Sequence, residues 1–265
     1  MPSFLEQQLA LEKSRTGYAV VTIVSSGGST PREYGKMLVT AEGYAGGTIG
    51  GGNAEYLAIA DAQEALKRGR NTVKTYTLQG EKSSTGMTCG GELKLLFEVY
   101  PARPVLVMIG AGHVGKAVLT LARFLGFDTV LLDDRPEADI RDAIALADRF
   151  VSTPDFTNEL VALDVPADAS YVIATHGHKF DSTALKSVLG KPFAYAGMIG
   201  SRGKVNKVIH DLRAEGVPEE KLAAARAPIG LELGGETPEA VAFSILAEIM
   251  QVTNGTSARP MREVR

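Results

Sequence analysis

The sequence predicts an α/β protein with two domains. A smaller α+β domain with a mostly antiparallel sheet is expected at residues 1–100, and a Rossmann-like domain of the dinucleotide-binding type, with a parallel sheet, at 104–265. Residues 105–109 form an apolar run that enters a glycine-rich turn and then a helical segment, the order typical of a nucleotide-binding unit. Beyond residue 104 strand and helix patterns alternate, which indicates a parallel sheet with right-handed crossovers. Before residue 100 strand patterns follow one another closely, which favours antiparallel pairing.

The first domain is expected to contain two helices and five strands. The helices are predicted at 4–14 and 53–67, and the strands at 18–24, 36–40, 44–49, 73–78 and 93–99. Asn53 is the expected N-cap of the second helix. The buried face of that helix is predicted to be Ala58, Ile59, Ala62, Ala65 and Leu66. Apolar residues recur at every second position from Leu93 to Val99, which predicts a half-buried final strand.

Two prolines, Pro101 and Pro104, mark the boundary between the domains because they stiffen the chain and prevent strand pairing. The second domain is expected to have strands at 105–109, 129–132, 171–174 and 193–199, and helices up to 125, at 182–189 and at 204–215. A last helix begins at Thr237 as N-cap, with Pro238 at its first position. Its buried stripe is predicted to be Val241, Ile245, Leu246 and Ile249.

Composition narrows the class of protein. The chain has 265 residues, 45% of them hydrophobic and 22% charged, as in soluble globular proteins. A net charge of -3 gives no electrostatic case for binding nucleic acid or an anionic membrane. No apolar stretch approaches the ~20 residues that span a bilayer, and the first residues do not resemble a signal peptide. Cys89 is the single cysteine, so a disulfide framework is excluded, and we expect a cytoplasmic protein.

The glycine turn after the first strand of the second domain is the main candidate ligand site. Gly110, Gly112 and Gly115 have the spacing that lets the backbone approach a phosphate at a helix N-terminus. About twenty residues later, Asp133 and Asp134 end a second apolar run, where an acid can hold a ribose hydroxyl. Two adjacent acids repel a 2′-phosphate and so favour NAD over NADP, unless the nearby Arg135 offsets their charge. The alternative is a tight strand–helix turn that binds nothing.

The first domain contains two further candidate sites. Gly50, Gly51 and Gly52 stand directly before a predicted helix, where backbone amides can close around an anion. The alternative is a turn that needs only one glycine. Ser29 and Arg32 follow the first long strand, and a hydroxyl with an arginine suits a phosphate or carboxylate. A solvent-exposed loop explains them equally well.

Cys89 lies next to Gly90 and Gly91, at the start of the last strand of the first domain. Flanking glycines would expose the sulfur and supply backbone N–H groups that lower the pKa of the thiol. Cys89 is therefore a candidate soft-metal ligand or sulfur-handling thiolate. The alternative is a small buried hydrophobic residue.

Two loops of the second domain complete the candidates. His176 follows the strand at 171–174, at the carboxyl end where open α/β sheets bind ligands. His178 and Asp181 are close to it in sequence, but three ligands on one short loop are a weak metal signal. After the strand at 193–199 come Gly200, Ser201 and Arg202, again a glycine turn before a helix.

These motifs, in this order, resemble the xanthine dehydrogenase accessory family (XdhC/CoxI-like). The resemblance rests on Gly28–Arg32, Gly47–Gly52 with Glu55, Cys89–Gly91, Ile109–Gly115 with His113, Asp133–Pro136, Thr175-His176, Gly197–Arg202 and Pro228–Pro238. It covers nearly the whole chain. One departure is visible: the family often has Thr-His-Asp-His where this chain has Thr175-His176-Gly177-His178, which weakens a metal role for this loop.

The resemblance implies a chaperone that binds the molybdenum cofactor (molybdopterin), supports its sulfuration and delivers it to the apo-enzyme of a molybdenum hydroxylase. It implies a homodimer and, for the sulfuration, a cysteine desulfurase as partner. The family's cysteine-glycine-glycine turn falls on Cys89, which carries over its role as contact to the metal and its sulfur. The second domain is expected to bind NAD or another nucleotide.

Two alternatives stay open at this point. The chain also fits an NAD(P)-dependent oxidoreductase in which His176 or Asp181 donates a proton and the first domain covers the substrate. The other is a regulatory module that only senses a nucleotide and contacts a partner.

Overall fold

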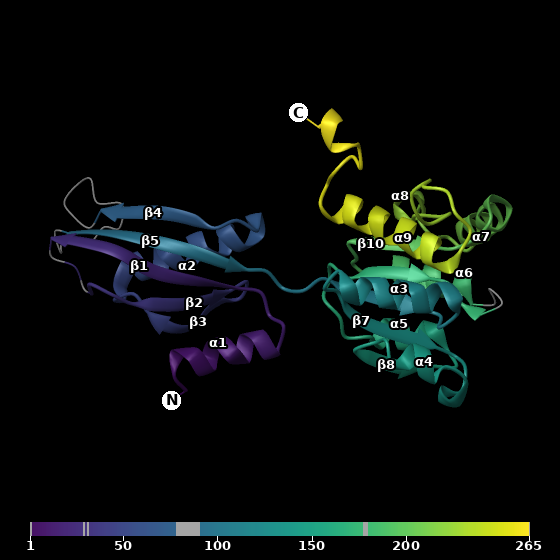
Figure 1. The fold of residues 1–265 in the computed structure, drawn as a ribbon, viewed down its shortest axis with the longest axis horizontal. Helices are drawn as coiled ribbons and strands as arrows, with labels where there is room; N and C mark the ends of the chain where they lie inside the picture. The colour runs from purple at the N-terminus through teal and green to yellow at the C-terminus, as the bar shows by residue number, and fades with distance from the viewer. Residues whose placement is uncertain (1, 29, 31, 78–90, 177–179, 265) are drawn as a thin grey trace. The chain divides into compact units, whose positions relative to one another are not determined.

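The computed structural model describes residues 2–28, 30, 32–77, 91–176 and 180–264. By its internal contacts the chain forms two compact units, Met1–Arg103 and Pro104–Arg265. The first contains an antiparallel sheet and the second a parallel one (Figure 1), which confirms the predicted fold class.

In the first unit a five-stranded sheet has the order β3-β2-β1-β5-β4, and every neighbouring pair is antiparallel. Alternate residues of β1 face opposite sides of this sheet. Val21 packs in the core that α2 covers, and Val20 packs with residues of α1. The elements are α1 (Phe4–Lys13), β1 (Tyr18–Gly28), β2 (Lys36–Thr40), β3 (Gly43–Thr48), α2 (Gly52–Arg68), β4 (Thr72–Thr77) and β5 (Gly91–Tyr100).

The start of α2 differs from the prediction. Gly51 is the N-cap and the helix begins at Gly52, so Asn53 lies in the first turn instead of capping it. The cap position requires a left-handed backbone, with φ of 76° at Gly51, which suits glycine and not asparagine in its usual capping conformation. The buried face includes Ala54, Ala58, Ala62 and Ala65, and the predicted Ile59 and Leu66 are only half-buried.

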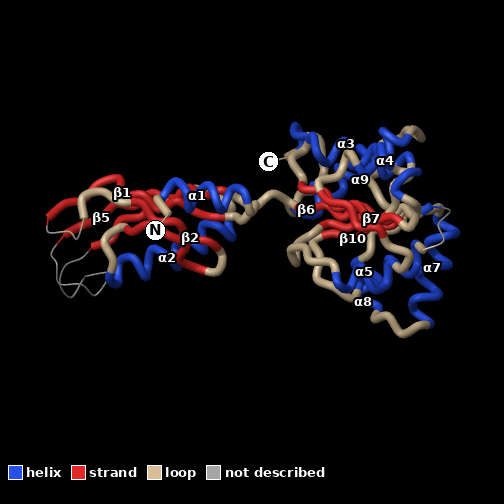
Figure 2. The backbone as a smooth tube through the Cα atoms, turned by 90° about the horizontal axis from the view of Figure 1, so that it is seen from below, coloured by secondary structure: helices blue, strands red, loops and turns tan. Residues whose placement is uncertain are grey.

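The second unit is a five-stranded parallel sheet in the order β10-β9-β6-β7-β8 with helices on both faces (Figure 2). Helices α3 and α9 cover the face that contains Leu106 and Met108, and α5 to α8 cover the face that contains Val107 and Ile109. The strands are β6 (Val105–Ile109), β7 (Asp128–Asp133), β8 (Arg149–Ser152), β9 (Ser170–Ile173) and β10 (Tyr195–Met198). The helices are α3 (His113–Phe124), α4 (Arg141–Ile144), α5 (Phe156–Ala162), α6 (Asp181–Leu189), α7 (Arg202–Ala214), α8 (Glu219–Ala224) and α9 (Pro238–Thr253).

The last helix confirms its sequence signals. The Thr237 side chain accepts a hydrogen bond from the Ala240 amide at 3.2 Å, and Pro238 opens α9. Ile245, Leu246 and Ile249 are buried as predicted, with Ala242 fully buried in place of the half-buried Val241. Strand β8 and helices α4, α5 and α8 were not predicted. Strand β8 is a four-residue strand at the sheet edge with an exposed Arg149, so it has no clear hydrophobic pattern. Asp155 was the available signal for α5, since its side chain caps the Thr157 amide at 2.8 Å.

Candidate functional site at the carboxyl edge of the parallel sheet

The turn after β6 lies where the strand order reverses, the position at which open α/β sheets bind ligands. It follows Ile109 in the central strand and contacts the end of β9. A Cβ atom on Gly110 would lie 2.1 Å from the carbonyl oxygen of Ala174. The backbone of these two loops therefore meets at van der Waals distance, and only glycine fits there.

The surroundings of Gly110, Gly112 and Gly115 differ, so glycine serves a different purpose at each position of this turn. Gly110 has φ of 111° and no room for a side chain, and a Cβ on Gly115 would lie 2.1 Å from the Gly110 carbonyl oxygen. Gly112 has an ordinary φ of -71°, and nothing described lies within 4 Å of its Cβ position. Packing of the fold therefore requires glycine at positions 110 and 115. It does not require glycine at position 112, where the open space is what a closely approaching ligand needs.

The N-terminus of α3 is suited to an anion. Its N-cap Gly112 makes no side-chain capping bond, and the first turn has no acidic residue. The first amides of a helix have no partner within the helix, and the dipole places partial positive charge there. His113 at the first position is exposed. Next to it, a cavity of about 570 Å³ is lined by His113, Lys116, Ala117, Thr120, Leu121, Pro238, Glu239 and Phe243.

Asp133, predicted as a ribose contact, is enclosed at the end of β7. Its side chain is 1% exposed and accepts hydrogen bonds from the Ala111 amide at 2.6 Å and from Arg135. Burial alone would raise the pKa of Asp133, but the Arg135 guanidinium and the two amides that donate to it outweigh burial and hold the pKa below its usual value. The adjacent Asp134 is exposed.

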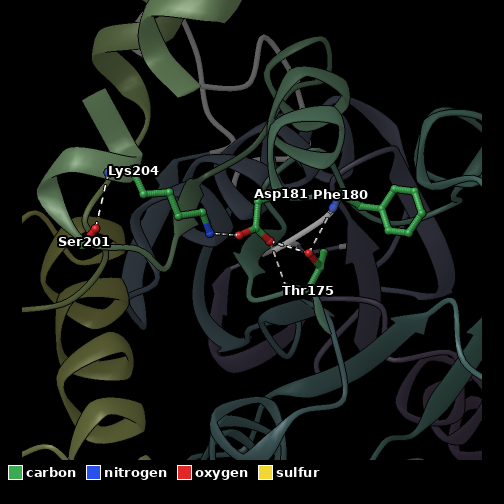
Figure 3. A network of polar contacts seen from close by, with 5 residues as sticks. All are labelled: Thr175, Phe180, Asp181, Ser201 and Lys204. Atoms are coloured by element: carbon green, nitrogen blue, oxygen red, sulfur yellow. Dashed lines mark hydrogen bonds and ion pairs between the residues drawn. The ribbon is translucent and has the colours of Figure 1, made fainter. Parts of the chain in front are cut away.

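The end of β9 is tied to α6 and α7 by a polar network (Figure 3). The buried Asp181 carboxylate accepts from the Thr175 amide at 3.0 Å and from the Thr175 hydroxyl at 2.6 Å, and it forms an ion pair with Lys204. Burial acts to raise the pKa of Asp181, but the Lys204 ammonium and the Thr175 donors outweigh burial and hold the pKa below its usual value, so the carboxyl is ionised at neutral pH. An ionised, enclosed carboxylate is poorly suited to donate a proton.

The remaining predicted residues of this edge lie on its surface. His176 is exposed, and residues 177–179, including His178, lie outside the described residues. The Ser201 side chain accepts from the Lys204 amide at 3.4 Å as the N-cap of α7 (Figure 3), and Arg202 is exposed. Gly200 lies half-buried between β10 and this cap.

The glycine run before α2 holds one of the protein's own carboxylates. Gly50, Gly51 and Gly52 all have positive φ, so the backbone requires all three glycines. Glu55 accepts from the Ile49 amide at 3.0 Å, the Gly51 amide at 3.1 Å and the Thr48 hydroxyl at 2.6 Å. Burial opposes ionisation of Glu55, but these bonds and the charge of Arg32 outweigh it and lower its pKa. These amides are therefore already bound to an anion.

Strand register places most motifs of the first unit at one end of its sheet. Gly91 pairs with Gly28 where β1 ends and β5 begins, and Lys36 pairs with Thr48 just before the glycine run. Arg32 is exposed on the loop between β1 and β2, and its positive charge helps to lower the pKa of Glu55. The predictions for Ser29, Cys89 and Gly90 concern residues outside those that the structure describes.

Among the residues that the structure describes, no group of three or more His, Cys, Asp or Glu side chains is arranged to hold a metal ion. None of the described helices has the length and hydropathy needed to cross a bilayer.

The sequence did not reveal which groups bond three carboxylates of the fold. Arg135 and Lys204 bond the buried Asp133 and Asp181, and Thr48 bonds the half-buried Glu55. The only signal was proximity for Arg135, two residues after Asp133. Lys204 lies 23 residues after Asp181, so no local pattern connects them.

The two family models that match the chain describe the same family. Residues 106–249 match the XdhC Rossmann domain, and residues 11–77 match the XdhC and CoxI family. The chain is 37% identical over 245 residues to the uncharacterized protein YqeB of Escherichia coli strain K12, covering 92% of this chain and 45% of that protein. It is 28% identical over 151 residues to a probable xanthine dehydrogenase subunit of Bacillus subtilis strain 168, covering 56% of this chain and 43% of that protein.

The chain thus spans less than half the length of these curated relatives. A crystal structure described as a xanthine dehydrogenase from Bacillus halodurans has the same fold, with a TM-score of 0.52, 19% identity and 97% of each chain covered. Because the XdhC Rossmann match alone spans more than half of its residues, the chain belongs to the XdhC family.

Proposed function

We propose that the protein is an accessory factor of a xanthine-dehydrogenase-type molybdenum hydroxylase, which binds the molybdenum cofactor, supports its sulfuration and delivers it to the apo-enzyme. Membership of the XdhC family supports this function, and so does the similarity to a relative described as a probable xanthine dehydrogenase subunit. A cysteine desulfurase and a second copy of the chain are proposed as further partners.

The open position at Gly112, beside the uncapped first turn of α3, is the observation that carries the binding part of the proposal. Molybdopterin and nucleotides both carry phosphate, and helix N-termini bind phosphate through their free amides. The residues present fit such a group. The backbone of Gly112 and His113 would hold the phosphate, and the cavity beside α3 would take an attached apolar or flat group.

In this proposal Cys89 contacts the molybdenum or its sulfur, as the family resemblance implies. The bound cofactor supplies metal and sulfur chemistry that the hydroxylase uses after delivery. This chain binds and protects the cofactor until then.

Transfer can be measured directly. The purified protein is loaded with molybdenum cofactor, freed of excess ligand and mixed with an apo-hydroxylase that lacks the cofactor. We expect hydroxylase activity to appear in proportion to the loaded protein and not with free cofactor at the same concentration. Equal activation by free cofactor would contradict delivery.

Variants separate the two parts of the proposal. Cys89→Ser is expected to lower retained molybdenum with the pterin largely kept, and Gly112→Ala to lower retention of both. Equal molybdenum content in wild type and Cys89→Ser would refute the role of the thiol. Native mass spectrometry identifies whichever pterin or nucleotide is retained.

The geometry gives less support to an NAD(P)-dependent oxidoreductase. Of its two candidate proton donors, Asp181 is ionised, buried and paired with Lys204. Steady turnover of nicotinamide absorbance with simple carbonyl substrates would favour the oxidoreductase over the accessory function.

A further inference from the structure

Asp133 occupies the position at which nucleotide-binding folds present an acid to a ribose. It is the last residue of β7, next to the turn after β6, where such an acid normally accepts bonds from the sugar hydroxyls. That function requires a carboxylate with free acceptor capacity facing the ligand.

The Asp133 carboxylate has neither property. Its Oδ1 accepts from the Arg135 amide at 3.0 Å and from Arg135 Nε at 2.8 Å. Its Oδ2 accepts from the Ala111 amide at 2.6 Å and from Arg135 Nη2 at 2.9 Å. A carboxylate has about four acceptor positions, so these four donors fill it, and only 1% of the side chain is exposed.

Arg135 covers the carboxylate with a two-pronged contact. Its guanidinium binds both oxygens, and 24% of its side chain is exposed. A ligand at this point of the surface therefore meets the N–H donors of Arg135, and no carboxylate oxygen of Asp133 is available to it. Bidentate arginine–carboxylate contacts are stronger than neutral hydroxyl contacts. A sugar hydroxyl is therefore a poor competitor for this carboxylate.

The contact to Ala111 has a consequence for the turn. Ala111 lies between Gly110 and Gly112, and its amide is held by a group 22 residues away. This bond holds the turn at Ala111. The amides that follow Gly112 begin α3, where the first amides of a helix have no partner within the helix. Asp133 thus acts on a ligand only through the backbone that it positions.

We propose that Asp133 is a positioning residue that fixes the glycine turn, and that this site selects its ligand by phosphate without reading a ribose 2′-hydroxyl. The inference rests on the proposed function and deepens it, because it names the ligand class. That class is a phosphate ester whose sugar is not recognised, or that has none, such as a pterin phosphate.

The test compares ADP with 2′-deoxy-ADP by calorimetric titration of the full chain. Wild type is expected to bind the two within twofold. Asp133→Asn is expected to weaken both by at least tenfold and equally, because the turn is released. The matched control Asp134→Asn, which changes the neighbouring exposed acid, is expected to bind both within twofold of wild type. A wild-type preference for ADP of tenfold or more that disappears in Asp133→Asn would overturn the proposal.

A second measurement needs no ligand. Hydrogen exchange of the Ala111 amide in the free protein is expected to be at least tenfold faster in Asp133→Asn than in wild type or Asp134→Asn. Unchanged protection overturns the positioning role. If neither nucleotide binds while Ala111 exchange responds as expected, selection of the ligand by its phosphate is overturned and the positioning role stands. Failure of the proposed function is recognised separately, by loss of molybdenum and pterin retention in the wild-type protein.

Arg135→Met serves if Asp133→Asn does not fold. This variant uncovers the carboxylate but leaves its bond to Ala111, so it is expected to gain a preference for ADP over 2′-deoxy-ADP of about fivefold or more. Equal binding of the two by this variant would show that Arg135 does not shield Asp133, contrary to the proposal.

Discussion

Adding one methyl group to Gly115 and, separately, to Gly112 should have very different effects on stability. A Cβ on Gly115 would lie 2.1 Å from the Gly110 carbonyl oxygen and 3.2 Å from the Gly110 carbonyl carbon. Both are backbone atoms of a turn that Ala174 confines from the other side. Gly115→Ala therefore forces α3 away from β6, and such overpacking costs about 1–3 kcal/mol.

Gly112→Ala meets no such obstacle. Its φ is -71° and nothing described lies within 4 Å of the new Cβ. Reduced freedom of the unfolded chain stabilises by about 0.4–1 kcal/mol, and the poorer N-cap preference of alanine offsets a similar amount. We expect the free energy of unfolding to stay within about 1 kcal/mol of wild type.

Calorimetry of the full chain tests this pair. With an unfolding entropy of about 2.1 cal/mol/K per residue over the unit Pro104–Arg265, 1 kcal/mol corresponds to about 3 °C in Tm. Gly115→Ala should lower the transition of this unit by about 3–9 °C, and Gly112→Ala should shift it by no more than about 3 °C. A Gly115→Ala protein that melts with the wild type, or equal losses in both variants, would refute the steric reasoning.

Three further outcomes follow from the bonds that the Asp181 and Glu55 carboxylates accept. Lys204→Met should lower the free energy of unfolding, measured in urea, by about 3–5 kcal/mol, because it leaves Asp181 charged without its ion-pair partner. The control Lys207→Met, at an exposed position of the same helix, should change it by less than about 0.5 kcal/mol. Equal effects of the two variants would contradict this role for the ion pair. Glu55→Gln should lower the free energy of unfolding by about 1.5–3 kcal/mol, since it replaces charge-assisted bonds to backbone amides. The control is Glu64→Gln, at an exposed position. If Glu55→Gln is as stable as wild type, that carboxylate has no structural role. The folded-state pKa values of Asp181 and Glu55 lie below the unfolded values of about 3.9 and 4.3. The stability that these carboxylates contribute is therefore complete above the unfolded pKa values and is lost as the pH falls through the folded pKa values. An equal free energy of unfolding in urea at pH 5 and pH 2.5 would contradict this pH dependence.

Local patterns predicted the elements whose boundaries are local. Strand β6 has the predicted bounds because Pro104 precedes the apolar run and Gly110 ends it. The Thr237 cap of α9 is likewise a contact within one helical turn. The start of α2 was mispredicted because its conformation depends on Glu55 binding the loop before it.

The candidate site was predictable as a place and not as an arrangement of contacts. Glycine spacing identified the turn after β6, but it did not show that packing requires Gly110 and Gly115 and leaves Gly112 open. Nor did it show that Asp133 is directed inward and Asp134 outward. Gly110 is confined by Ala174, and Asp133 is held by the Ala111 amide, and both neighbours are distant in the sequence.

Chain order and periodicity alone determined the α/β class, the parallel and antiparallel sheets and the glycine turn at a strand end, because each depends on residues a few positions apart. Only the tertiary structure decided which charged groups are enclosed and with what partner. Asp133 with Ala111 and Asp181 with Lys204 are separated by 22 and 23 residues. A buried charge is stable only when folding brings its partner to it, so its role is a property of the packed molecule.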